Sequence, residues 1–446
     1  MMNKLILIII AGALLIPKQI NAQTEQYSMS VQEAVDYALV HNQNILNAQL
    51  DVVAAEGFVK ENIATGFPQV NANIDLGNNI ELPTSFLDSG FFGGTEGERF
   101  PVQFGTKFSG NATLTANQMV FDGVFFVGLE AARTFQALST KNQIKTKIDV
   151  VEAVTKAYYN VLVNELTLEL EEKNYGRLDT LLNETKAMYE SGFAERIDVS
   201  RVRMQYNNIK VNRDNSRKML VIAESLLKFQ MGMPVERQLL LTDVLSQDMF
   251  SDAPEESFNY DQRIEYSILQ TREKLAILDI KRTKVEYLPS IDLYANVGAI
   301  AGTGLAGDLF NIGDEWFTFS AVGLRMKIPI FDGLRKHMTV QQKKAKLSQL
   351  NNSFDLLKNG IDLEIQQARI AYSNSVDYMN VQQENVKISE DVYNVTKIKY
   401  QQGVGSNIEV ITADAAYKEA QTNYFIALYT ALLSKVEYNK ALGLIN

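Results

Sequence analysis

Two acidic side chains follow glycines at matching places in the two halves of the chain. Asp198 lies six residues after Gly192, and Glu409 lies six residues after Gly403. Each acid stands near the expected start of a helix, and Tyr400 precedes the second glycine. Carboxylates in this position could act as an acid–base pair, attract cations around an opening, or stabilise the helix that they begin.

These three kinds of chemistry need different surroundings. A hydrolase with paired carboxylates needs a substrate pocket, which the end of a helical hairpin does not imply. Acids in the first turn of a helix interact favourably with the helix dipole. A ring of carboxylates around a narrow opening would favour cations and would resist closure unless it were neutralised. We favour the ring, and the helix-end interpretation stays open beside it.

Other reactive groups are scarce. The only histidines, His41 and His337, lie in different halves and lack the spacing of metal ligands, so we predict no enzyme, no metal and no cofactor. The chain has no cysteine, which excludes a disulfide scaffold, a thiol nucleophile and a lipid-modified N-terminal cysteine. The net charge of −10 would repel a phosphate backbone, so nucleic acid is not an expected partner.

The two glycine turns belong to a longer internal repeat. The matched residues, each pair 211 positions apart, are Tyr189, Gly192, Ile197, Asp198 and Val199, and Tyr400, Gly403, Ile408, Glu409 and Val410. A repeat of this length indicates a duplicated domain. We therefore divide the mature chain into a first repeat at 23–232 and a second at 258–446, joined by a linker at 233–257.

Residues 1–22 have the features of a secretory signal peptide. Lys4 precedes the apolar run 5–16, and Ala22 ends the small-residue cleavage site. That run is too short for a membrane anchor, and no later run reaches the roughly 18 apolar residues of a membrane helix. We expect an exported protein, and insertion into a membrane would require β-strands.

Each repeat contains two segments in which apolar and polar residues alternate. They lie at 69–82 and 104–121, and at 289–301 and 316–330. Such strands are typical of membrane barrels, although a soluble sandwich would have the same pattern. Arg325 and Lys327 alternate with apolar residues, so we expect both cations to face the lumen. The aromatic residues that flank the strands, and could form an interfacial girdle, are Phe86, Phe91, Phe92, Phe100, Phe104, Phe310, Trp316, Phe317 and Phe319.

Helical periodicity fills most of the remaining chain. A first helix is expected over 31–66, and the segment from Gly123 to Tyr189 keeps heptad-like spacing. At 1.5 Å per residue, a helix of that length would be roughly 100 Å long. Turns at 191–194 and 402–405 then reverse the chain before two return helices.

The strand count has a consequence for assembly. Four strands cannot close a barrel around a lumen, and open strand edges are not tolerated in lipid. We therefore expect the chain to form oligomers, in which three copies supply twelve strands and the long helices pack into a tube.

With these features, the sequence resembles the TolC family of outer-membrane efflux proteins over essentially its full mature length. The resemblance rests on 34–68, from Ala-Val-Asp-Tyr-Ala-Leu-Val-His-Asn-Gln-Asn-Ile to Gly-Phe-Pro, on Ile-Pro-Ile-Phe-Asp-Gly at 328–333, and on the two turn motifs. It implies a mainly α-helical trimer with a twelve-stranded outer-membrane β-barrel, continued by a long α-helical coiled-coil tunnel in the periplasm. The linker 233–257 would form part of an equatorial region.

The resemblance also implies how the protein works. A homotrimer in the outer membrane of a Gram-negative bacterium would be the passive duct of an efflux or type I secretion system. A periplasmic adaptor protein and an inner-membrane transporter would open it, and the transporter would supply the energy. The adaptor would dock beside the tip turns at Gly192, Phe193, Gly403 and Val404, although ordinary turn packing explains these residues equally well.

The family keeps its periplasmic gate at the same tips. Asp198 and Glu409 occupy positions where the family carries acidic residues. Tyr400 takes the place of a tyrosine that, in well-known members, bonds to the first of these acids. In a trimer the two acids would place up to six carboxylates around the opening.

This chain departs from the family at two gate positions. Gly405 replaces a basic residue, and Thr412 replaces a second acid. Arg196 is a candidate for the missing cation.

Two other protein classes share part of the pattern. A general porin would share the barrel but would not need such long helices. A soluble periplasmic scaffold would share the helices but would need neither a signal peptide nor four alternating strands. Drugs, metals, peptides and proteins would all pass a wide polar lumen, so the sequence singles out no cargo.

Overall fold

The computed structural model describes residues 27–88, 99–245, 250, 258–311, 313 and 316–445. The predicted signal peptide, Phe91, Phe92 and most of the acidic part of the linker lie outside these residues. The chain forms two compact units, and each draws on both halves of the sequence. The sheet unit comprises 48–143 and 264–358, and the tip unit comprises the residues up to 47, 144–263 and those from 359 onward.

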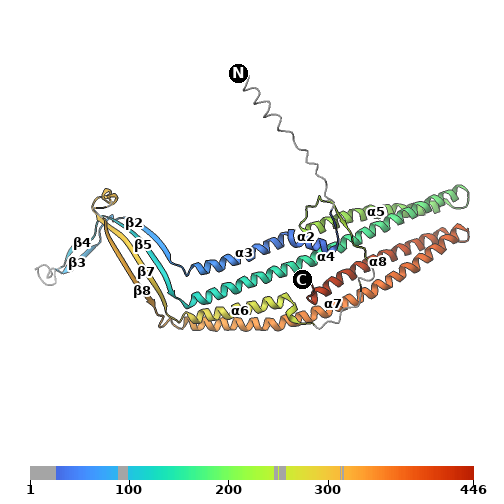
Figure 1. Cartoon of the computed structure of the whole chain (residues 1–446). Coiled ribbons are helices and arrows are strands. Elements are labelled where there is room, and N and C mark those ends of the chain that lie inside the picture. The colour runs from blue at the N-terminus through green and yellow to red at the C-terminus, as the bar shows by residue number, and fades with distance from the viewer. Residues whose placement is uncertain are drawn as a thin grey trace, which may run out of the picture. The chain divides into compact units, whose positions relative to one another are not determined.

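An antiparallel sheet of four strands forms the first part of the sheet unit. The strands are β2 (Gln69–Asn78), β5 (Phe108–Phe121), β7 (Ser290–Thr303) and β8 (Trp316–Lys327). They pair in the order β2-β5-β7-β8, which places strands from the two halves of the sequence side by side (Figure 1). The last strand ends just before Ile328 and Pro329, because a proline has no N–H to donate to a strand ladder.

The register gives the sheet one apolar and one polar face. Ala72, Leu114 and Val297 share one row across the first three strands, and Val322 lies two positions away along β8 on the same face. The residues on the opposite face include Asn71, Asn73, Asp75, Asn111, Thr113, Thr115, Asn296, Arg325 and Lys327. The alternation therefore separates apolar from polar side chains over most of the sheet. The start of β8 is the exception, because Phe317 and Phe319 lie on the polar face and Thr318 and Ser320 lie on the apolar face.

A short hairpin lies between β2 and β5, in the part of the chain that separates the first two expected strands. Strands β3 (Thr84–Asp88) and β4 (Arg99–Gln103) pair antiparallel, with Phe86 opposite Pro101. A two-stranded ribbon tolerates this proline because each of its strands is an edge strand. Gly105, at φ 115°, lies between β4 and β5. A further connection, between β7 and β8, contains the short helix η4 (Ala306–Phe310).

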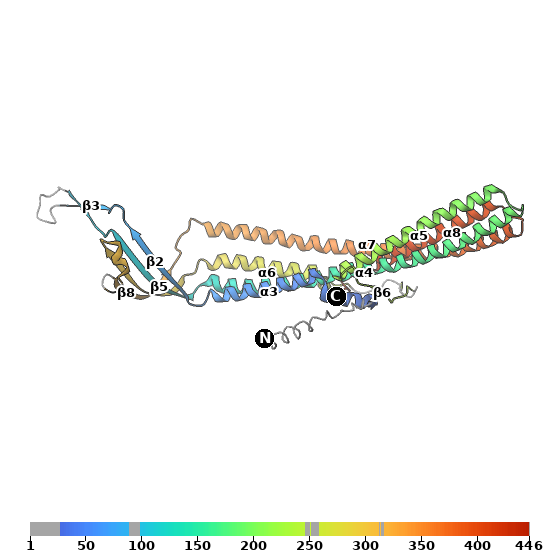
Figure 2. The ribbon, with the colours of Figure 1, turned by 90° about the horizontal axis from the view of Figure 1, so that it is seen from above.

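Helices complete the sheet unit. It contains most of α3 (Gln43–Ala64), the first part of α4 (Gly123–Glu190), α6 (Ile264–Val285) and the first part of α7 (Arg335–Gln401), which Figure 2 shows from above. Polar contacts connect them: Lys141 Nζ donates to Thr271 Oγ1 at 2.7 Å, and Lys343 pairs with Asp279 at 2.8 Å. Among the described helices of the chain, none is both long and apolar enough to cross a membrane.

The first expected helix is two helices. The prediction of one helix over 31–66 was wrong, because α2 (Val31–His41) ends at Asn42, which is extended at φ −67° and ψ 128°. Asn42 Nδ2 donates to Gln230 O at 2.7 Å, and its Oδ1 accepts the N–H of Asn44. This side chain therefore satisfies backbone groups at the break. Ser30 precedes α2 and forms a capping box with Glu33, in which each side chain accepts a backbone N–H of the other residue.

The tip unit consists of two helical hairpins and a small clamp. The hairpins join the rest of α4 to α5 (Arg196–Met231), and the rest of α7 to α8 (Asn407–Ala441) (Figure 1). The clamp contains α2 and the parallel pair β1 (Tyr27–Met29) and β6 (Leu239–Leu241). The short helix η3 (Tyr260–Gln262) lies beside α7, where Tyr260 Oη donates to the carboxylate of Asp362. Tyr158 Oη donates to Met29 O at 3.0 Å and fixes the clamp to α4.

Candidate functional site

Both tip turns have the same hydrogen-bonded form. Gly192 and Gly403 have positive φ, at 81° and 75°. The Gly192 N–H donates to Tyr189 O, and the Phe193 N–H donates to Met188 O at 2.8 Å. The second turn repeats this pattern around Gly403. These are Schellman motifs, in which a glycine accepts the left-handed conformation that ends a helix.

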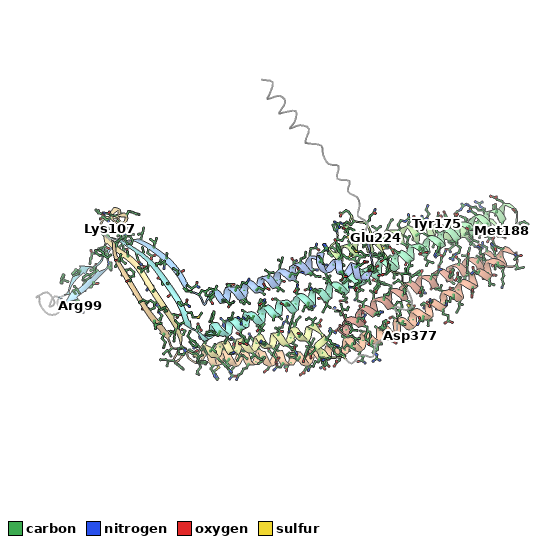
Figure 3. All side chains as sticks on the ribbon, in the orientation of Figure 1. Arg99, Lys107, Tyr175, Met188, Glu224 and Asp377 are labelled. Atoms are coloured by element: carbon green, nitrogen blue, oxygen red, sulfur yellow. The ribbon has the colours of Figure 1, made fainter. Side chains whose placement is uncertain are left out.

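The residue after each turn glycine is exposed. Phe193 is 81% exposed and Val404 is 79% exposed. In a Schellman motif an apolar residue at this position often packs back on its own helix. Figure 3 marks Met188 in the last turns of α4, beside the first of these turns. Both predicted docking residues therefore present apolar surface at the end of a hairpin.

Asp198 lies in the first turn of α5 and is well engaged. Its Oδ2 accepts the backbone N–H of Glu195 at 3.1 Å, and its Oδ1 lies 3.5 Å from Nη1 of Arg201. The local contacts of Asp198 are therefore those expected of an acid in the first turn of a helix. Arg201, which sequence reasoning missed, is the neighbouring cation, whereas Arg196 begins α5 with an exposed side chain. The spacing of three residues between Asp198 and Arg201 could have indicated this pair.

Glu409 has a similar backbone position but an exposed side chain. Its N–H donates to Oγ of Ser406, which caps α8, at 3.4 Å. Thr412 donates its hydroxyl to Ile408 O within the same helix. An added Cβ at Gly405 would lie only 3.1 Å from a backbone nitrogen, which leaves little room for the basic residue of the family.

The Tyr400 side chain is buried within the tip unit and forms no hydrogen bond to Asp198. Its side chain packs in an apolar cluster with Leu178, Val202 and Val410. Among the described residues, its hydroxyl has no hydrogen-bond partner. The link from Tyr400 to Asp198 that the resemblance implies is therefore not formed in this structure.

A buried polar cluster lies further along α4 and α8. Asp414 is only 2% exposed, and its carboxylate lies 2.6 Å from Nζ of Lys418 and 2.9 Å from Nη2 of Arg177. The Arg177 contact is a close ion pair whose angle is not that of a hydrogen bond. Its guanidinium also lies 4.8 and 4.9 Å from the ring centroids of Tyr393 and Tyr417.

Burial perturbs the ionisable groups of this cluster. Burial lowers the pKa of Lys418 from its usual value, although the charge of Asp414 opposes that change. Burial raises the pKa of Glu171, and the charge of Lys418 opposes this. Burial also raises the pKa of Tyr393 to about 12. The sequence contained one signal of the cluster, because Asp414, Lys418 and Gln421 interrupt the apolar residues on the buried side of α8.

A groove borders the cluster within the tip unit. It has a volume of about 350 Å³ and lies between α4, α5 and α8. Its lining includes Asn164, Glu171, Asn212, Thr422 and Tyr429. Most of the lining residues carry an amide or hydroxyl group, although apolar atoms make up more of the lining surface. None of the described residues forms a group of three or more His, Asp or Glu side chains that could hold a metal ion.

The predicted lumen cations lie on the polar face of the sheet. Arg325 stands opposite Asp292 of β7 in the register, and its guanidinium lies 5.1 Å from the centroid of Tyr294. Gly323 gives the Tyr294 ring room, because an added Cβ there would lie 2.7 Å from the hydroxyl. Lys327 ends the same strand on the same face.

Aromatic side chains gather at the ends of the strands that lead into the β3/β4 hairpin and the η4 connection. Trp316 Nε1 donates to Leu309 O at 3.1 Å, and its ring lies against Gly110. Phe86, Phe310 and Phe317 are exposed. Phe317 lies on the same face of β8 as Arg325, so it does not fit the expected girdle on the apolar side. One aromatic side chain thus packs against the sheet and the η4 connection, while others present free surface.

Comparison with known proteins agrees with this architecture. The family model described as "Outer membrane efflux protein" matches residues 34–232 and 270–444. The "Probable efflux pump outer membrane protein TtgC" of Pseudomonas putida is 22% identical over 424 residues, which is 93% of this chain and 83% of the relative. The "Outer membrane protein TolC" of Vibrio cholerae is 21% identical, over 75% of this chain and 76% of the relative.

A solved structure has the same fold. The crystal structure of CusC, described as a transmembrane channel, superposes with a TM-score of 0.74 at 17% identity. The match covers 95% of this chain and 94% of CusC. The family model spans most of the chain and both of its halves. The chain therefore belongs to the outer membrane efflux protein family.

Proposed function

We propose that this protein is a trimeric, passive export duct, the outer-membrane component of a multipartite efflux or type I secretion system. The observation that carries the proposal is the four-stranded sheet, with one largely apolar face, one largely polar face and two edges that pair with no other strand among the described residues. The same chain also forms two long helical hairpins. Membership of the efflux family supports an outer-membrane location.

The sheet supports a shared barrel. Its edge strands are β2 and β8, and an open edge is costly in lipid because backbone groups there lack partners. Joining β8 of one protomer to β2 of the next in three copies would give twelve strands. The apolar face would then contact outer-membrane lipid, and Arg325 and Lys327 would line the lumen.

Exposed apolar stripes on the helices support the same trimer. Two stripes in the tip unit have heptad-like spacing: Met219, Ile222, Leu226 and Phe229 on α5, and Val381, Ile388, Val392 and Val395 on α7. Large exposed apolar surfaces with such spacing indicate contact with other helices. Neighbouring protomers would cover them and close a periplasmic tunnel.

The repeat is also part of the proposal. The two halves, 23–232 and 258–446, would supply equivalent hairpins, and the linker 233–257 would belong to the equatorial region. The two tip turns support this equivalence, because both end with a glycine at positive φ and the same pair of backbone hydrogen bonds.

The tip would carry both the gate and the docking site. Asp198 and Glu409 would form the carboxylate ring, with Tyr400, Arg196 and Thr412 beside it. An adaptor protein would contact the turns at Gly192, Phe193, Gly403 and Val404, and an inner-membrane transporter would supply the energy. The duct itself would make or break no bond and would need no cofactor.

The assembly can be tested directly. Cells that produce the protein would be fractionated, and the detergent-extracted protein would be weighed by size-exclusion chromatography with light scattering. We expect the protein in the outer membrane, with a mass of three chains of about 50.1 kDa less their signal peptides. A monomer, or a protein found only in the soluble periplasm, would contradict the proposal.

A further inference from the structure

A polar seam separates two apolar clusters between α4 and α8. On the tip side, Leu178 of α4 belongs to a cluster with Val410 of α8. On the other side, Val163 of α4 belongs to a cluster with Leu428. The residues between these clusters, which we call the polar seam, are Glu171, Asn174 and Arg177 of α4 and Asp414, Lys418 and Gln421 of α8. The two helices therefore meet through charges and amides over about two turns.

Asp414 is the centre of the seam. Its carboxylate contacts a cation from its own helix, Lys418, and a cation from α4, Arg177. Asn174 Nδ2 donates to Gln421 Oε1 at 3.4 Å across the same seam. The side chains of Asp414 and Asn174 are almost fully buried. Water therefore reaches few of the polar groups in the seam, and these groups rely on one another for ion pairs and hydrogen bonds.

Arg177 connects three helices. It belongs to α4, pairs with Asp414 of α8, and lies against the rings of Tyr417 of α8 and Tyr393 of α7. A guanidinium is suited to this arrangement because it stays charged and stacks on aromatic faces. The α4/α5 hairpin is thus fixed to both helices of the α7/α8 hairpin at one residue.

A polar seam of this kind is suited to a helix–helix contact, such as that of α4 with α8, that separates and re-forms. Buried ion pairs contribute little net stability compared with apolar packing, but they specify register. When such a seam separates, its charges regain hydration, whereas an apolar seam would expose apolar area to water. The cost of parting is therefore lower here than in the apolar clusters on either side.

We propose that Arg177, Asp414 and Lys418 form a latch that holds the α7/α8 hairpin in register against α4 while the duct is closed. The latch releases when the duct opens, and it acts separately from the acids at the tip turns. This inference rests on the proposed function, because it assumes a duct with closed and open states.

The first test is an Asp414→Asn variant of the full-length protein, measured in a planar bilayer. The substitution leaves Arg177 and Lys418 without their shared carboxylate, so closure is disfavoured. We expect the open probability to rise about tenfold, which corresponds to about 1.4 kcal/mol. The control is Asp214→Asn, because Asp214 pairs with the adjacent Arg213 of α5 and does not reach across the seam.

The second test does not depend on the folding of Asp414→Asn. The chain has no cysteine, so Asn174→Cys together with Gln421→Cys gives a unique pair across the seam. A short thiol-reactive cross-linker with a reducible bond would join the two helices. We expect cross-linking to abolish the spontaneous openings and reductant to restore them. Each single cysteine variant, treated in the same way, should open normally.

The outcomes separate the latch from the duct. A wild-type conductance that neither Asp414→Asn nor the cross-link changes would overturn the latch alone. A wild-type protein and an Asp414→Asn variant that both insert but conduct no current would overturn the duct and the latch together. A higher open probability in Asp414→Asn, with fewer openings after cross-linking, would support the latch.

Discussion

Lys440 Nζ lies 2.6 Å from Oε2 of Glu152 and so joins the last turn of α8 to α4. Lys156, one turn along α4, contacts the other oxygen of the same carboxylate at 2.9 Å. Burial of Glu152 opposes its ionisation, but hydrogen bonds and charges from the two lysines outweigh burial, so its pKa lies below the usual value. The Glu152 carboxylate therefore joins α4 to α8 at residues that are distant in sequence from both tip turns.

Replacing Glu152 with Gln should reduce stability in a pH-dependent way. A lowered pKa stabilises the folded protein above the unfolded value of 4.5, and this stability is lost as pH falls through the folded value. We expect a loss of about 1 kcal/mol at pH 7, after allowance for partial exposure of the pair. Thermal unfolding followed by circular dichroism would measure it.

The Glu152 effect has a matched control. Glu169 and Lys173 form an exposed pair on α4, and Glu169→Gln should change stability little at any pH. The difference between Glu152→Gln and wild type should shrink at acidic pH. A difference that stays constant between pH 7 and pH 3 would show that the carboxylate charge is not its cause.

The turn glycines should be costly to replace. Nothing lies within 4 Å of a Cβ added at Gly192 or Gly403, so the cost comes from the positive φ alone. We expect each Ala variant to lose about 1 kcal/mol. Gly176 also has free space but lies inside α4, so Gly176→Ala should stabilise the protein by a similar amount. Melting temperatures that moved in the same direction at all three sites would contradict this account.

The two faces of β8 should respond differently to a charge. Val322 is 74% exposed on the apolar face, and its neighbour Ala321 lies on the polar face. Near the bilayer centre, a Lys on the lipid side costs about 2–4 kcal/mol. Val322→Lys should therefore lower the amount of protein in the outer membrane, while Ala321→Lys should not. Equal levels of both variants would argue against lipid contact at Val322.

A variant in which apolar side chains replace the charges of the latch should be stable, but its channel should open rarely. Replacing Arg177, Asp414 and Lys418 together with Met, Leu and Met removes three buried charges and keeps most of the side-chain volume. Such replacements are often neutral or stabilising, by about 1–4 kcal/mol. We expect a melting temperature at least as high as that of wild type, with fewer channel openings. A variant that is more stable and opens more often would contradict the role of the seam.

The long helices, the alternating strands and the tip turns could be predicted from the sequence because each has a local cause. Periodicity determines the buried face of a helix or strand, and Gly192 and Gly403 supply a backbone conformation that other residues avoid. The face of Arg325 and Lys327 on β8 followed from the same alternation, whereas the order of the four strands was not predicted, because periodicity does not determine which strands pair.

The missed features depend on contacts between distant residues. Asn174 and Gln421 are 247 positions apart, and only the packing of α4 on α8 brings them together. Asn42 breaks a helical pattern because Gln230 O lies within reach of its side chain. The position of Tyr400 was inferred from the family alone, and this chain packs that side chain in an apolar core.

The most direct test of the duct is its single-channel conductance in a planar bilayer, with and without a multivalent cation on the tip side. The account predicts a small, cation-selective conductance that the cation blocks, and a block that weakens when Asp198→Asn and Glu409→Gln are combined. A large conductance that no multivalent cation blocks would contradict the carboxylate gate, and a protein that fails to insert would contradict the duct.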